Sequence, residues 1–151
     1  MSLQQWARNG WLRPHTSSPR EIRDLLGIVD RDLLDASENI SPDWRFGIAY
    51  NAVLKLATLL LHASGHRPER NLQHFRTLQA VPLLLGGEWE RESAYLASCR
   101  MKRNTVEYDC AGGATHRDAD ELLDLTKKLR VAVIEWIRTQ HPELRPPEEP
   151  G

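Results

Sequence analysis

The sequence predicts an all-α protein, an antiparallel up-down bundle of four to five helices, on three observations. Several long segments repeat apolar residues at the three- and four-residue spacing of amphipathic helices, and no segment reads convincingly as a strand. Ser-Pro pairs open two of these segments, and Gly-Gly pairs follow two others. A chain of 151 residues that is 40% hydrophobic and 27% charged can bury one core without metals or disulfides.

The first two long helices carry clear start signals. Ser18 is expected to cap the first, with Pro19 at the first helical position and Glu21 completing a capping box. The second opens with Ser41 and Pro42 and is expected to run to residue 65. Its apolar residues cover most of the circumference, so it should be the central and most buried helix.

Two further helices are bounded by proline and glycine. A shorter helix is predicted over 68–81, stopped by Pro82 and the Gly86-Gly87 pair. The next is predicted over 88–109 and should end before Gly112.

The two ends of the chain differ in character. The last helix should start near Thr115 or Asp118 and carry one apolar face. At the front, Trp6 and Trp11 flank a short helix that should end near Gly10 and be held to the bundle by their indoles. Residues 1–140 are therefore expected to form a single domain, followed by a disordered Pro- and Glu-rich tail over 141–151.

Composition points to a soluble cytoplasmic protein. The net charge of −1 gives no global case for nucleic-acid binding, so any such site must be local. Cys99 and Cys110 fall on one predicted helix about 16 Å apart, too far to form a disulfide, which suits a reducing compartment. No signal peptide is expected at the N-terminus. The most apolar run, 52–65, carries Lys55 and His62 and is too short to span a bilayer.

The stretch CRMKRNTVEYDCAGG at 99–113 concentrates polar groups unlike those of a purely solubilising face. On a helical wheel of about 100° per residue, Cys99, Val106 and Cys110 form an apolar stripe. A polar stripe lies beside it, and Lys102 points further round toward solvent. The polar stripe consists of Arg100, Arg103, Asn104, Glu107 and Tyr108.

Spacing alone leaves two interpretations open. Arg103 and Glu107 are four residues apart, as in an ordinary salt bridge along a helix. Tyr108 can equally be an aromatic residue at the edge of the core with its hydroxyl in water. The alternative is a set of polar groups gathered for binding or catalysis.

The segment RMKRNTVEYD, together with the order of helices around it, resembles the HEPN superfamily of small helical-bundle domains over about residues 5–138. The resemblance implies a homodimer in which the motif helices of two subunits face one cleft. It also implies a prokaryotic toxin–antitoxin or defence setting, with a nucleotidyltransferase-type antitoxin as partner. Several members of the superfamily are metal-independent ribonucleases, and others bind nucleotides or are inactive.

Carried onto this chain, the resemblance makes Arg103 and Tyr108 the candidate catalytic residues. The candidate ligand-binding residues around them are Arg100, Asn104, Glu107 and Asp109. Tyr108 stands where nuclease members have a histidine, and tyrosine is a poor general base unless nearby cations lower its pKa. Arginines retain their capacity to bind phosphate, so binding of RNA or a nucleotide phosphate is the leading expectation, with ribonuclease activity open.

The histidines offer weaker candidates. His62 and His66 have the spacing of a zinc-binding pair, but Gly65 should end the helix between them and no third ligand has motif spacing. His116 follows a glycine pair and could supply an imidazole to the motif. We therefore expect no metal and no cofactor. The alternative function, from another class, is a non-catalytic dimerisation or protein-interaction module.

Overall fold

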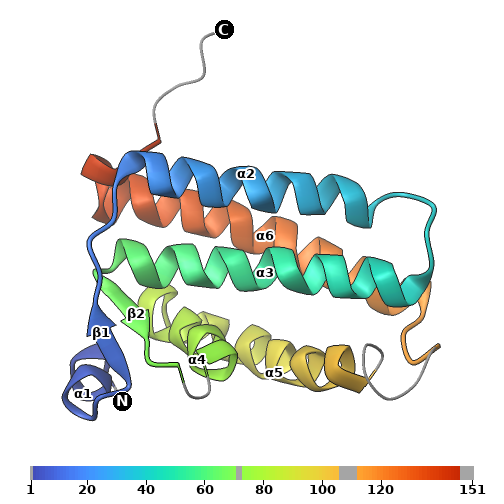
Figure 1. The fold of residues 1–151 in the computed structure, drawn as a ribbon, viewed down its shortest axis with the longest axis horizontal. Helices are drawn as coiled ribbons and strands as arrows, with labels where there is room; N and C mark the ends of the chain where they lie inside the picture. Colours follow the sequence, from blue (N-terminus) through green and yellow to red (C-terminus); the bar gives the residue numbers. More distant parts are fainter. Residues whose placement is uncertain (1, 71–72, 106–111, 147–151) are drawn as a thin grey trace, which may run out of the picture.

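The computed structural model describes residues 2–70, 73–105 and 112–146, which form a helical bundle with one small sheet. The sequence predicted an all-α bundle of four to five helices; the described residues form six α-helices and a two-stranded sheet, so the mostly-α class is confirmed. Figure 1 shows α2, α3 and α6 side by side, with α4 and α5 end to end along another side of α3. The helices are α1 (Leu3–Arg8), α2 (Pro19–Ala36), α3 (Pro42–Ala63), α4 (Gln73–Leu85), α5 (Glu90–Asn104) and α6 (His116–Gln140).

Helix α3 is the centre of the core, as its sequence predicts. Its side chains Phe46, Tyr50 and Leu56 are 1% exposed or less, and α2, α4, α5 and α6 all pack against it. By length and composition alone α3 could cross a membrane, since the full helix is longer than the apolar run within it. About two thirds of its most apolar window is buried among the other helices, which is typical of the core helix of a globular protein.

The predicted helix starts are confirmed at three places. Ser18, Ser41 and Thr115 each accept a hydrogen bond from a backbone N–H three residues on. Thr115 and Asp118 form a complete capping box. At Ser18 the reciprocal half of the box is not formed, because the Glu21 carboxylate is hydrogen bonded to two histidines instead.

Helix α4 does not stop at Pro82, contrary to the prediction. Pro82 lies inside the helix, which continues to Leu85. Proline at this position cannot donate to the carbonyl oxygen of Leu78, four residues earlier. The Ser93 hydroxyl of α5 donates to that oxygen at 3.4 Å, so a neighbouring helix supplies the missing donor.

A two-stranded sheet is present that the sequence did not predict. Strands β1 (Leu12–Pro14) and β2 (His66–Pro68) pair antiparallel, with Arg13 opposite Arg67. Each strand has three residues and ends in proline, so no alternating pattern marks it. Gly65, with φ of 91°, lets the chain turn from α3 into β2. The sheet brings the segment before α2 against the end of α3.

The first and last described segments both pack on the bundle. Trp6 and Trp11 meet edge-to-face at 6.2 Å between ring centroids, and the Arg76 guanidinium of α4 lies 3.6 Å from the centroid of Trp11. The predicted role of the indoles is thus confirmed. At the other end, a 3₁₀ turn over Pro142–Leu144 buries Leu144 in the core, so the packed region extends beyond residue 140.

Candidate functional site

Helix α5 presents the first part of the predicted motif. Arg100 and Arg103 are half-buried near its C-terminal end, and Asn104 is exposed one residue further on. Cys99 is 3% exposed, as the predicted apolar stripe requires. Lys102 does not point freely to solvent as expected, because its ammonium lies 3.1 Å from Asp118 of α6.

The two arginines lie against aromatic rings of other helices. The Arg100 guanidinium is 5.6 Å from the ring centroid of Phe75 on α4. That of Arg103 is 5.7 Å from the ring centroid of Tyr50 on α3. Cation–π contacts at these distances hold both guanidinium groups over the region where α3, α4 and α5 meet.

His74 and Lys55 add to the positive charge there. His74, near the start of α4, is exposed, yet neighbouring protein atoms partly desolvate its ring. This desolvation, together with the charges of Arg103, Arg100 and Lys55, lowers the pKa of His74 below its usual value. We call Lys55, His74, Arg100 and Arg103 the cation cluster. It draws on three helices.

Tyr50 lies beneath the cation cluster. It is 1% exposed, and its hydroxyl has no hydrogen-bond partner within the described part of the chain. Burial raises the pKa of Tyr50 to about 12, although the charges of Arg100 and Arg103 act in the opposite direction. Tyr50 is therefore neutral at physiological pH and retains a hydroxyl proton that it can donate.

Three of the predicted site residues are not placed by the structure. Glu107, Tyr108 and Asp109 lie in the segment 106–111, outside the described residues. His116, which could supply an imidazole to the motif, has its Nδ1 3.0 Å from a guanidinium nitrogen of Arg45. Of the predicted site residues, the structure describes Arg100, Arg103 and Asn104.

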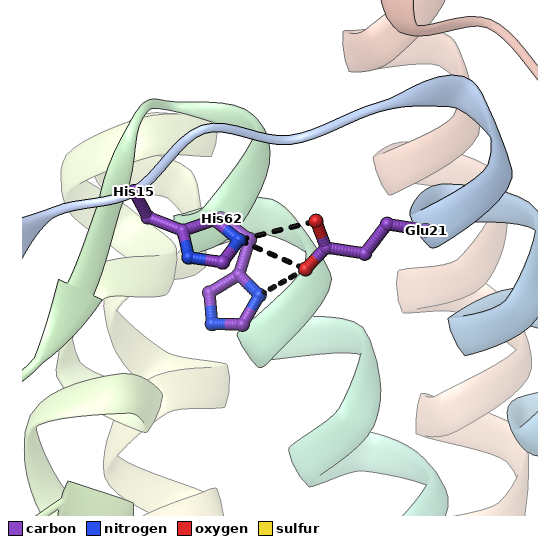
Figure 2. Close-up of side chains that lie close together, drawn as sticks. All are labelled: His15, Glu21 and His62. Carbon is purple, nitrogen blue, oxygen red and sulfur yellow. Dashed lines mark hydrogen bonds and ion pairs between the residues drawn. The ribbon is translucent and has the colours of Figure 1, made fainter.

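A second cluster joins His15, Glu21 and His62, here called the His-Glu-His cluster (Figure 2). His15 Nε2 lies 2.9 Å from Glu21 Oε1 and 3.1 Å from Oε2, and His62 Nδ1 lies 2.9 Å from Oε1. The two imidazole rings are 4.0 Å apart between centroids. His66, which has zinc-pair spacing with His62 but was not expected to bind a metal with it, lies 3.3 Å from the Ser64 hydroxyl.

The protonation of the His-Glu-His cluster follows from its burial and hydrogen bonds. Burial lowers the pKa of His62, and the hydrogen bond to Glu21 offsets this in part. Burial alone would raise the pKa of Glu21, but hydrogen bonds from His62 and His15 outweigh it and lower that pKa. A neutral imidazole and a charged carboxylate are thus favoured side by side.

The sequence does not single out His74, His15 or Glu21 as site residues. His15 and Glu21 are six residues apart, but His62 lies 41 residues beyond Glu21, and no spacing rule links positions 74 and 100, or 15 and 62. The sequence pattern around Glu21 predicts a capping box with Ser18, in which the Glu21 carboxylate would bond to the start of the helix and not to histidines.

No protein-family model matches the chain, and neither a curated protein nor a solved structure matches it significantly. The resemblance to HEPN domains therefore rests on the sequence pattern.

Proposed function

We propose that this protein is a HEPN-like domain that binds the phosphate groups of RNA or of a nucleotide through the cation cluster. The observation that carries the proposal is the convergence of Lys55, His74, Arg100 and Arg103 from three helices onto one partly exposed region. Like charges held together repel each other, and a bound phosphate would relieve that repulsion while accepting hydrogen bonds from the guanidinium groups.

Two features support an anion as the ligand. Within the described part of the chain, Lys55, His74 and Arg100 form no ion pair with a carboxylate. The exposed amide of Asn104 and the exposed ring of His74 add hydrogen-bonding groups at the rim. Such a site would bind a phosphate through charge and geometry without requiring a metal.

Two affinities test this proposal, one for a fluorescent single-stranded RNA and one for ATP, which represents a mononucleotide ligand. Arg100→Ala and Lys55→Ala should each weaken binding about tenfold or more, because a charged hydrogen bond contributes about 1.5–3 kcal/mol. Arg117→Ala is the matched control, since the Arg117 side chain is 89% exposed on α6 and faces Glu121. Equal affinities for the wild type and both cluster variants would contradict the proposal.

RNA cleavage requires an experiment separate from RNA binding. RNA is incubated separately with the wild type, Arg103→Ala and Tyr108→Phe. If the motif is a ribonuclease site, the wild type should cleave the RNA and the two variants should not. If RNA binds but stays intact with the wild type, the protein is a binding domain without nuclease activity.

The resemblance extends the proposal to a cytoplasmic homodimer in a prokaryotic toxin–antitoxin or defence system, with a nucleotidyltransferase-type partner. The second candidate function is a non-catalytic dimerisation module, in which the exposed face of the motif helix, with Met101 69% exposed, would contact a second copy. A wild type that dimerises in light scattering but binds neither RNA nor ATP would favour this module.

A further inference from the structure

We propose that the His-Glu-His cluster binds one divalent transition-metal ion of the zinc class, at a site separate from the cation cluster. The atoms that face one another are His15 Nε2, His62 Nδ1 and a carboxylate oxygen of Glu21, all within 4.8 Å (Figure 2). Two imidazoles and one carboxylate are the protein ligands of many zinc sites, which keep a fourth position for water.

The distances fit a metal after small movements. Tetrahedral bonds of about 2.1 Å place neighbouring ligand atoms roughly 3.4 Å apart. Each histidine nitrogen now lies 2.9 Å from the same oxygen, Glu21 Oε1. Moving each histidine nitrogen about half an ångström further from Glu21 Oε1 would therefore make room for an ion. Rotation about the side-chain bonds allows this movement. A ring nitrogen can bind a metal when the imidazole carries its proton on the other ring nitrogen.

The three ligands are held in place by backbone contacts that do not depend on the metal. The His15 backbone N–H donates to the Gly65 carbonyl at 2.9 Å, next to the β1–β2 pairing. Glu21 lies in the first turn of α2, which Ser18 caps. The His62 carbonyl accepts from the Ser17 hydroxyl at 2.9 Å. Such fixed donors reduce the conformational entropy lost on metal binding.

Access and charge set the expected strength of the site. The side chains of His15, Glu21 and His62 are 20%, 29% and 18% exposed, so an ion can enter and water can complete its coordination. The charge of Arg67 also acts on His62 and opposes a bound cation. We therefore expect weaker binding than at a closed four-ligand zinc site.

Metal titration of the chelator-treated full chain tests the proposal. Co²⁺ should bind with one ion per chain and give the visible absorption of a tetrahedral site, and Zn²⁺ should displace it. His15→Ala and Glu21→Gln should each weaken Co²⁺ binding at least tenfold. His66→Ala, which removes a nearby imidazole outside the cluster, should leave binding unchanged. Circular dichroism of each variant confirms that the fold is retained.

Three results would overturn the metal site: no stoichiometric Co²⁺ binding by the wild type, equal binding by the cluster variants, or an equal loss in His66→Ala. Glu21→Gln keeps the size and polarity of the side chain, and residue 15 lies outside every helix of the described structure. At least one of the two variants should therefore retain the fold. RNA and ATP affinity should be the same with and without metal, so the two proposed sites can fail independently.

Discussion

At the scale of single residues, the candidate site depends on groups whose charge is costly without a ligand. His74 is the clearest example, because partial burial and the charges of Arg103, Arg100 and Lys55 all disfavour its protonated form. A bound phosphate would reverse the sign of that electrostatic environment. His74 therefore places an imidazole near the two arginines from another helix.

His74 should make folding stability depend on pH. Its pKa is lowered in the folded protein, so the unfolded chain binds more protons as the pH falls through the usual imidazole range near 6.5. Stability should therefore be lost on acidification from about pH 7.5 to about 5.5, and His74→Gln should lose less than the wild type. Urea unfolding at both pH values measures this. His66→Gln is the control for removal of an imidazole. If the wild type and His74→Gln lose the same unfolding free energy between the two pH values, His74 is not the cause of the pH dependence.

At the scale of elements, neighbouring helices satisfy groups that local sequence leaves unsatisfied. Pro82 deprives the Leu78 carbonyl of its donor within α4, and Ser93 of α5 replaces it. The helix can then continue for another turn toward the start of α5.

A double-mutant cycle tests this compensation. Ser93→Ala should cost about 0.5–1 kcal/mol of unfolding free energy in the wild type, as expected for one hydrogen bond. In a Pro82→Ala background the cost should approach zero, because the substituted alanine supplies a backbone N–H to the Leu78 carbonyl. Ser98→Ala on the same helix is the control, since its hydroxyl bonds within α5. Equal costs of Ser93→Ala in both backgrounds would be inconsistent with compensation.

The sequence predicts features set by local residues but not features set by contacts between helices. The caps at Ser18, Ser41 and Thr115 are local signals, and the structure confirms all three. The end assigned at Pro82 was wrong because a side chain on the next helix decides it. Likewise, the partners of Glu21 lie on two other segments, so a rule based on one helix assigned its carboxylate incorrectly.

At the scale of the whole molecule, Arg45 connects three helices at one end of the bundle. This residue is 9% exposed, and its Nε donates to the Ala36 carbonyl at the end of α2 at 2.7 Å. Its two terminal nitrogens lie 3.0 Å from His116 Nδ1 and 2.5 Å from Asp120, both on α6. Asp43 nearby accepts hydrogen bonds from the Gly112 and Ala114 N–H groups, which fixes the chain entering α6.

Replacing Arg45 should therefore destabilise the bundle more than replacing a surface arginine. Arg45→Lys keeps the charge but cannot reach all three partners, so we expect a loss of about 1–3 kcal/mol. Arg138→Lys should cost less than about 0.5 kcal/mol, because Arg138 and Glu135 are both exposed. Urea unfolding compares the two, and similar losses would argue against a linking role for Arg45.

The proposed function depends on phosphate binding by the cation cluster, and the salt dependence of RNA affinity tests this most directly. Arg100→Ala should reduce the slope of log affinity against log salt by about 0.7 relative to the wild type, because one phosphate contact with the single-stranded RNA is lost. Arg117→Ala should leave the slope unchanged. Wild type and Arg100→Ala with the same affinity and the same slope would contradict the claim.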